Sequence, residues 1–197
     1  MSPIDSDALD QADMARLKSG HDPALNALMD RHAGALFGFL CRWVGDEDAA
    51  NDLSQEAFVR VYQKRASFQE GLRFSTWLFT IAANLARNHL RARGRRAEVP
   101  LDFESGDEPG ISERPIPEAG LSPDQQAVRG EQQVAVRQAV SELPEDLREA
   151  VVLCELEDRS VAEAATILQT TVKAVESRLY RARGRLRERL SRWLSAS

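Results

Sequence analysis

The sequence predicts an all-α protein made of two small helical domains joined by a flexible acidic linker. Apolar residues recur at spacings of three and four along most of the 197 residues, whereas no segment alternates for long enough to predict a strand. The stretch 98–123 lacks this pattern and contains five prolines and three glycines, a composition typical of a linker. We therefore expect a first domain at 1–97, a linker at 98–126 and a second domain at 127–197.

The formal net charge of −5 is distributed unevenly along the chain. Residues 1–13 contribute −4 and residues 98–127 contribute −7, which leaves +6 for the remainder. Both acidic segments look unstructured, so the parts that are expected to fold are basic. The overall charge alone argues against a nucleic-acid partner, but this asymmetry indicates a polyanionic one.

Composition also excludes several classes of protein. A hydrophobic content of 43% is enough for a core and excludes wholesale disorder. No long uncharged apolar run predicts a transmembrane helix, and the acidic N-terminus is unlike a signal peptide, so we expect a cytoplasmic protein without membrane insertion. Cys41 and Cys154 lie far apart in apolar helical patterns, which predicts two buried reduced thiols.

The first domain is expected to contain three amphipathic helices. The first covers an apolar surface from Leu25 to Leu40, and Gly45 and Asp46 end it. The apolar side of the second comprises Leu53, Ala57, Phe58, Val61 and Tyr62. Its polar side comprises Asp52, Gln55, Glu56 and Arg60. After a loop at 67–74, the third helix starts near Ser75, and its buried stripe comprises Trp77, Leu78, Ile81 and Leu85.

The second domain has clearer helix boundaries. Pro144 and the acids after it fit the first turn of a helix. Ser160 and Glu163 form a capping-box pattern, and Thr171 is the expected N-cap of a long helix that begins at Val172. The core stripe of that long helix comprises Val175, Leu179, Ala182, Leu186 and Leu190.

Residues 161–180 have the layout of a helix-turn-helix, which places its second helix in the DNA major groove. Eight basic residues against two acids follow from Lys173 to Arg192. A solvated basic helix in an ordinary bundle is the alternative, and the capping box, turn and core spacing favour DNA binding over it.

A second candidate surface lies in the first domain. Its third helix carries Asn84, Arg87, Asn88, Arg91 and Arg95 at spacings of three or four. The aromatic residues Phe68, Phe74, Trp77 and Phe79 precede this face. Aromatic rings stack on unpaired bases and arginines follow the backbone, so this surface predicts a single-strand site. The alternative is that the aromatic rings belong to the core, which we expect for Trp77 and Phe79; Phe68 and Phe74, in the loop, are left open.

The polar face of the second helix is too acidic for DNA and is interpreted either as a solvated face or as a protein docking site.

Among the catalytic motifs, no HExxH spacing, phosphate-binding glycine loop or GxSxG motif is present. We therefore expect no enzyme activity, no catalytic residues, no metal site and no cofactor.

Four segments carry a resemblance to a known family. They are residues 48–58 (DAANDLSQEAF), residues 74–91 (FSTWLFTIAAN and, after Leu85, ARNHLR), residues 143–150 (LPEDLREA) and residues 177–183 (SRLYRAR). In this order and spacing, the chain resembles bacterial RNA polymerase sigma factors of the extracytoplasmic-function (ECF) group in the sigma-70 family. The resemblance implies two helical domains, called σ2 and σ4, on a flexible linker.

The resemblance also implies a partner for each surface. Core RNA polymerase, with its β′ and β subunits, is the expected protein partner. The residues expected to bind it, at the clamp helices of β′, are Asp48, Asp52, Gln55, Glu56 and Phe58. Binding of promoter DNA at the −10 element falls to Phe68, Phe74, Trp77, Asn84, Arg87, Asn88 and Arg91. Binding of the −35 element falls to Lys173, Glu176, Ser177, Arg178 and Arg181. The family further implies an anti-sigma factor as a regulator.

Three residues depart from the family pattern. Gln169 takes a turn position usually held by glycine, Lys173 stands where glycine is common, and Glu176 stands where a base is common. A left-handed backbone at Gln169 costs about 1 kcal/mol relative to glycine. A stand-alone helix-turn-helix regulator is the competing hypothesis, and it leaves the single-strand surface unexplained. A metal-dependent nuclease would need convergent carboxylates, which adjacent Asp46, Glu47 and Asp48 do not provide.

Overall fold

The computed structural model describes residues 3–69, 71–97 and 123–196. The first domain comprises α1 (Pro3–Lys18), α2 (Ala24–Val44), α3 (Glu47–Gln63), the 3₁₀ turn η1 (Arg65–Ser67) and α4 (Phe74–Ala97). The second domain comprises α5 (Pro123–Ser141), α6 (Glu145–Val151), the π-helical turn η2 (Val152–Leu156), α7 (Val161–Ile167) and α8 (Val172–Ala196). The described residues contain no strand, which confirms the predicted all-α class.

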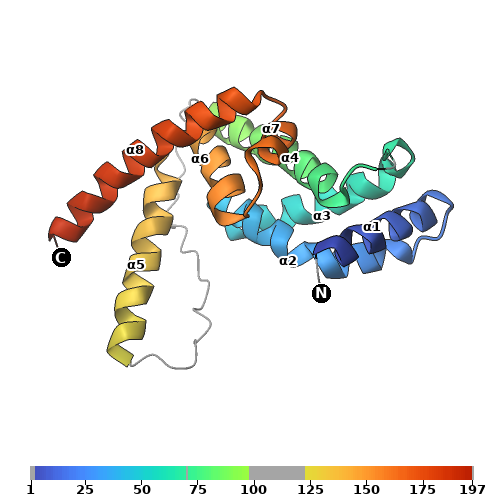
Figure 1. The fold of residues 1–197 in the computed structure, drawn as a ribbon, viewed down its shortest axis with the longest axis horizontal. Coiled ribbons are helices and arrows are strands. Elements are labelled where there is room, and N and C mark those ends of the chain that lie inside the picture. The colour runs from blue at the N-terminus through green and yellow to red at the C-terminus, as the bar shows by residue number, and fades with distance from the viewer. Residues whose placement is uncertain (1–2, 70, 98–122, 197) are drawn as a thin grey trace.

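The centre of the first domain is α2, which packs against α1, α3 and α4 (Figure 1). Its buried side chains include Leu36, Phe39, Leu40 and Trp43. Gly45 ends α2 in the left-handed conformation (φ 73°), and the Asp46 carboxylate then accepts a hydrogen bond from the N–H of Ala49 at 3.0 Å. This glycine and N-cap reverse the chain between α2 and α3.

The acidic N-terminal segment is helical from Pro3, so the expectation that residues 1–13 are unstructured is wrong. Asp10 and Asp13 are buried between α1 and α2. The Arg31 guanidinium donates to Asp10 Oδ1 at 2.9 Å and to Asp13 Oδ2 at 2.6 Å, and His32 Nε2 lies 2.7 Å from Asp10 Oδ2. Burial works to lower the pKa of Arg31, but the hydrogen bonds to Asp13 and Asp10 outweigh it and raise that pKa. Asp10 and Asp13, two of the acids expected to lie in an unstructured segment, therefore anchor α1 to α2.

The second domain contains the expected helix-turn-helix. Ser160 accepts from the N–H of Glu163 while the Glu163 carboxylate accepts from the N–H of Ser160, which completes the predicted capping box on α7. In the turn that follows, Gln169 has φ 53°, the left-handed conformation that the missing glycine would favour. Thr171 Oγ1 accepts from the N–H of Ala174 at 3.2 Å and caps α8, as predicted.

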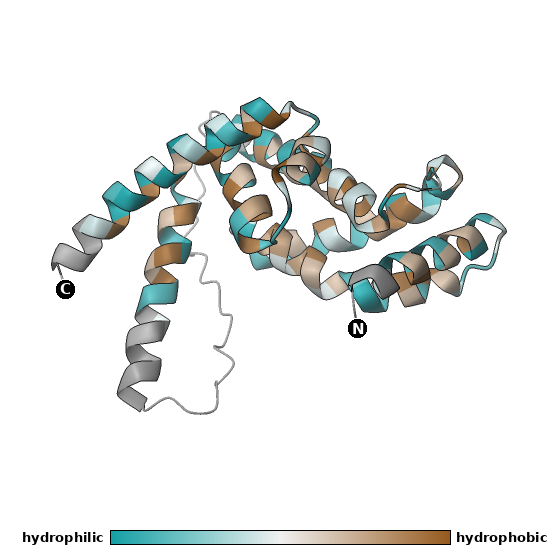
Figure 2. Ribbon diagram, viewed as in Figure 1, coloured by the Kyte–Doolittle hydropathy of each residue, from teal (hydrophilic) through white to brown (hydrophobic). Residues whose placement is uncertain are grey.

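The two domains share one continuous core of buried apolar residues. α4 lies beside α7, and the end of α2 lies beside η2 and α5 (Figure 1). In Figure 2 the helices that meet at these junctions carry many hydrophobic residues, whereas the described part of α8 is mostly hydrophilic. Most of the expected linker, residues 98–122, lies outside the described residues, and α5 already begins at Pro123.

Candidate nucleic-acid and protein interfaces

The outer face of α3 carries most of the residues predicted to bind a protein. Asp48, Asp52 and Gln55 are exposed, and Glu56 accepts from Arg60 Nε at 2.8 Å on the half-exposed edge of that face. Phe58 is only 4% exposed and packs in the core, so its ring is not available to a partner in this structure. Sequence periodicity already placed Phe58 on the apolar side of the helix.

An apolar residue on the outer face of α3, Val59, was missed by the sequence analysis. It is among the exposed large hydrophobic residues and follows Glu56 by three positions, so both lie on one side of the helix. The sequence signal was an apolar residue outside the buried stripe. Val59 thus gives this otherwise acidic face an exposed apolar side chain that a protein partner could contact.

The polar face of α4 is divided between exposed and engaged residues. Asn88, Arg91 and Arg95 are exposed, whereas Asn84 and Arg87 are half-buried. Arg87 Nη1 donates to Asn84 Oδ1 at 3.4 Å, so these two predicted −10 residues contact each other. The guanidinium of Arg87 also donates to two groups of the second domain, Glu149 Oε2 at 3.0 Å and the carbonyl of Leu168 at 3.3 Å.

The aromatic residues at the two ends of the loop before α4, Phe68 and Phe74, are core residues in this structure. Phe68 and Phe74 are 3% and 0% exposed, and their ring centroids are 6.3 Å apart. The ring centroid of half-buried Trp77 lies 5.1 Å from that of Phe68, and the ring centroid of His32 of α2 lies 5.1 Å from that of Phe74, both pairs at a tilt of 56°. The question left open for Phe68 and Phe74 is thus answered for this arrangement: neither ring offers a face on which a base can stack.

Helix α1 supports the same loop through contacts that no local sequence pattern predicts. Lys18 Nζ donates to the carbonyl of Phe68 at 3.1 Å, and Gln11 Nε2 donates to the carbonyl of Leu72. Arg73 Nε donates to Asp7 Oδ2 at 2.8 Å, and hydrogen bonding to this carboxylate raises the pKa of Arg73. The position of the loop therefore depends on the helix formed by the acidic N-terminal residues.

The outer face of α8 is open to solvent. Lys173, Glu176, Ser177 and Arg181 are exposed, and Tyr180 between them is 81% exposed. Arg181 forms a surface ion pair with Asp146 at 3.4 Å. Arg178 differs from these, because it is half-buried and its Nη1 donates to Glu149 Oε1 at 2.6 Å. Four of the five predicted −35 residues are accessible, and the fifth is tied to α6.

The residue that binds both Arg87 and Arg178 is Glu149 of α6. The residue is 4% exposed, and each of its carboxylate oxygens accepts from one of the two arginines. Burial is the largest influence on its pKa and raises it, although both arginines act in the opposite direction. Sequence reasoning missed Glu149, because an acid next to the apolar residues of a helix is normally expected to face solvent.

The described parts of the chain contain neither a cluster of metal ligands nor a membrane-spanning helix. No group of three or more His, Cys, Asp or Glu residues there is placed to hold a metal ion. None of the helices there combines the length and the apolar character that crossing a membrane requires. Cys41 and Cys154 form no disulfide; Cys41 is buried as expected, whereas Cys154 is only half-buried.

Comparisons with known proteins agree with the two helical units. Residues 28–96 match the family Sigma-70 region 2, and residues 133–186 match the family Sigma-70, region 4. RNA polymerase sigma-H factor of Pseudomonas aeruginosa is 36% identical over 88% of this chain and 90% of its own length. The chain belongs to the RNA polymerase sigma factors of the ECF group.

A second relative and a solved structure support the assignment to ECF sigma factors. ECF RNA polymerase sigma-E factor of Haemophilus influenzae is 34% identical over 88% of this chain and 91% of its own length. A co-crystal structure of the sigma factor RpoE with the anti-sigma factor NepR from Bartonella quintana matches with a TM-score of 0.65 and 27% identity, covering 84% of this chain and 96% of that one. As a sigma factor, the protein is a non-enzymatic initiation factor that gives RNA polymerase its promoter specificity.

Proposed function

We propose that this sigma factor docks on core RNA polymerase through the outer face of α3, holds the unpaired −10 strand on α4, and places α8 in the major groove of the −35 element. The observation that carries the proposal is that one chain combines an exposed acidic helix face with two separate basic helices. The acidic face suits a protein partner, and the basic helices suit a polyanion.

The −35 part of the proposal rests on the accessible face of α8. Lys173, Ser177 and Arg181 are exposed near the start of a helix that follows a capped α7 and a tight turn. Lysine and arginine neutralise phosphates and donate to guanine, whereas Glu176 is suited to accept a hydrogen bond from cytosine N4. We therefore expect Glu176 to change the preferred −35 sequence relative to relatives that carry a base there.

The −10 part rests on Asn84, Arg87, Asn88 and Arg91 along one side of α4. Melting of the promoter draws its free energy from the capture of unpaired bases, not from hydrolysis. Two weak DNA sites on one polymerase-bound chain also act together, because binding at one raises the effective concentration of the other. Because Phe68 and Phe74 are buried, Trp77 is the aromatic residue expected to stack on a base while the loop keeps this conformation.

Regulation by an anti-sigma factor follows from the same surfaces. The matched Bartonella quintana structure is a sigma factor bound to an anti-sigma factor. We propose that the present protein also has such a partner, and that it acts in the cytoplasm, where core polymerase is found.

The docking assignment is tested with the double variant Asp52→Ala/Glu56→Ala. We expect it to weaken binding to purified core polymerase by about tenfold or more, because charged groups at such an interface fix partner choice. Asp30→Ala/Glu142→Ala removes two exposed acids elsewhere and is the matched control, with unchanged affinity. Equal affinities for both double variants would refute the role of α3.

Run-off transcription with core polymerase tests the function as a whole. We expect Asn84→Ala to reduce open-complex formation while core binding is retained. A stand-alone regulator, in contrast, would bind promoter duplex tightly without polymerase and give no promoter-dependent transcript. The two results separate the proposed function from its competitor.

A further inference from the structure

Helix α1 contacts the loop before α4 near both of its ends. Lys18 Nζ donates to the carbonyl of Phe68 at 3.1 Å, where the loop begins, and Gln11 Nε2 donates to the carbonyl of Leu72, close to where it ends. A backbone hydrogen bond within the loop, from the N–H of Leu72 to the carbonyl of Gln69, is long at 3.3 Å. Side chains of α1 therefore hold two backbone carbonyls of this loop.

Arg73, the last residue of the loop, is shared between α1 and the second domain. Its Nε donates to Asp7 Oδ2 at 2.8 Å, and its Nη1 donates to Glu163 Oε1 at 2.7 Å. A substitution of Arg73 would therefore disturb two elements at once. The contacts of Lys18 and Gln11 join α1 directly to the loop, so these two residues isolate what α1 contributes.

The contact made by Lys18 leads to Trp77, the half-buried residue that we expect to stack on a base. The ring centroid of Phe68 lies 5.1 Å from that of Trp77. Because Phe68 is only 3% exposed, the close packing around it restricts the movement of its ring. Lys18 thus holds the backbone of the residue against which Trp77 packs.

A second route joins α1 to Trp77 through α2. Asp10 Oδ2 lies 2.7 Å from His32 Nε2, and the ring centroid of His32 lies 5.1 Å from that of Phe74. Phe74 is fully buried, and its ring centroid lies 6.3 Å from that of Trp77. The two routes, through Phe68 and through Phe74, both end at Trp77.

Helix α1 is itself firmly attached to the first domain. Met14 and Leu17 on its inner side are fully buried. The Arg31 guanidinium of α2 donates to both Asp10 and Asp13. Close packing and charged hydrogen bonds together leave α1 little freedom to move, so it can act as a fixed support for the loop.

We propose that α1 is a positioning element for promoter opening: through Lys18 and Gln11 it holds the loop before α4, and with it Trp77, in the geometry that captures an unpaired −10 base. The proposal rests on the base-capturing role of α4 given above. A loop that is already ordered loses less conformational freedom when the base binds, so more of the stacking free energy is left for melting the promoter. Helix α1 precedes residues 28–96, which match region 2, so this role adds to that of the matched segment.

Substitution of Lys18 tests the proposal in holoenzyme reconstituted with core polymerase, on a promoter found by run-off transcription with the wild-type protein. Lys18→Met removes the amino group and keeps the length of the side chain, whereas Lys18→Arg keeps a charged donor. We expect Lys18→Met to lower the rate of open-complex formation at saturating holoenzyme about fivefold, with unchanged affinity for core polymerase. Lys18→Arg should restore most of this rate, and Gln11→Met should act in the same direction as Lys18→Met.

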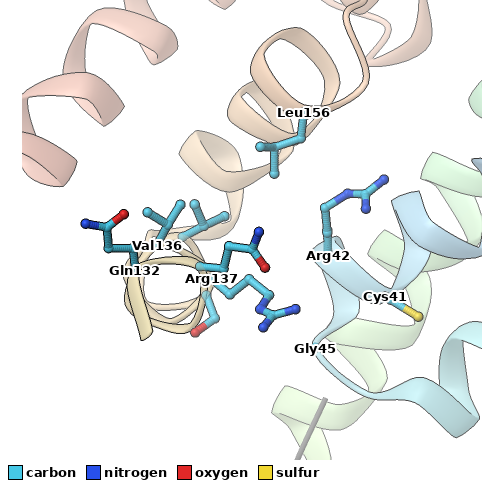
Figure 3. Close-up of a pocket in the computed structure, with 10 residues that line it drawn as sticks. Cys41, Arg42, Gly45, Gln132, Val136, Arg137 and Leu156 are labelled. Atoms are coloured by element: carbon cyan, nitrogen blue, oxygen red, sulfur yellow. The ribbon is translucent and has the colours of Figure 1, made fainter. Parts of the chain in front are cut away.

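Two control variants separate positioning from loss of charge and from loss of stability. Lys64→Met removes the same charge from an exposed lysine close to the same loop and should leave the opening rate unchanged. Cys41→Ala removes a buried side chain of α2 that lies about 14 Å along the helix from His32. Cys41 lines a pocket of about 620 Å³ between α2 and α5 (Figure 3). Its removal should lower the midpoint of thermal unfolding without slowing promoter opening.

A double-mutant cycle shows whether Lys18 acts through Trp77. Trp77→Leu keeps an apolar side chain but removes the aromatic face, and we expect it to slow promoter opening. In that background Lys18→Met should have little further effect, because the ring that Lys18 positions is gone. A lysine that only stabilises the domain, or that binds DNA itself, would slow opening by the same factor in both backgrounds. Equal factors would overturn the proposal.

Hydrogen exchange in the free protein measures the support of the loop without DNA. Amides of residues 68–78 should exchange about threefold faster or more in Lys18→Met than in the wild type, and at the wild-type rate in Lys18→Arg and Lys64→Met. An unchanged opening rate in Lys18→Met, at a promoter that the wild type opens, would overturn the positioning role and leave the proposed function intact. Faster exchange in Lys18→Met, but no promoter-dependent transcript from the wild type, would instead refute the proposed function and show that α1 supports the loop for another purpose.

Discussion

The two helices that carry the proposed DNA surfaces, α4 and α8, differ in accessibility although both present arginines at helical spacing. The outer face of α8 is exposed along Lys173, Ser177 and Arg181, while on α4 the central arginine, Arg87, is half-buried against the second domain. The residue types alone predicted that both helix faces would be equally accessible to DNA. The comparison shows that the domain packed against a basic helix decides whether that helix face is accessible. The sequence of the helix itself carries no information about this packing.

The largest expected difference is in the free energy of unfolding, between variants of a core aromatic residue of α4 and of an exposed aromatic residue of α8. Phe74→Ala should lower the free energy of unfolding by about 3–5 kcal/mol, because a fully buried ring is removed. Tyr180→Ala should change it by less than about 0.5 kcal/mol, since this side chain is 81% exposed. Urea denaturation followed by circular dichroism measures both. A small loss for Phe74→Ala would mean that the ring is a surface platform after all.

A smaller effect separates two arginines on α8 itself. Arg178→Ala removes a donor from buried Glu149 and should cost about 1–3 kcal/mol of stability. Arg181→Ala breaks only a surface ion pair and should cost at most about 0.5 kcal/mol, while it weakens binding to −35 duplex. Denaturation and duplex anisotropy on the same two variants should therefore rank them in opposite orders. Equal stability losses would contradict the buried role of Arg178.

The smallest effect compares a left-handed residue from each domain. Gln169→Gly should stabilise the protein by about 1 kcal/mol, because glycine adopts the observed φ of 53° without steric cost. Gly45→Ala, at φ 73°, should destabilise it by a similar amount. Thermal unfolding of both variants measures the two shifts. If Gln169→Gly has no effect, some other interaction of Gln169 compensates for its backbone conformation.

Local signals in the sequence predicted much of the second domain. Ser160, Glu163 and Thr171 act as the caps that their spacing indicated, because capping depends on neighbours within a few residues. The order of the helices and the acidic face of α3 were readable for the same reason. Polymerase and DNA contacts of individual side chains remain predictions.

Features that depend on distant residues were not predictable. Asp10 and Asp13 read as unpaired surface charge, because nothing near them in the sequence identifies Arg31 and His32 as partners. Phe68 and Phe74 fitted either a core or a base-stacking role, and tertiary packing decides between the two. The shared binding of Arg87 and Arg178 by Glu149 joins residues from three helices, which periodicity within one helix cannot reveal.

The buried carboxylates of α1 determine where the protein can be divided for separate study. The family match to region 2 begins at residue 28, which makes that position an obvious place to start a fragment. Such a fragment would lack Met14 and Leu17, both fully buried, and would leave Arg31 and His32 without the acids that they bind. Truncation at the family boundary would therefore yield a weakened first domain, so an isolated fragment has to retain α1.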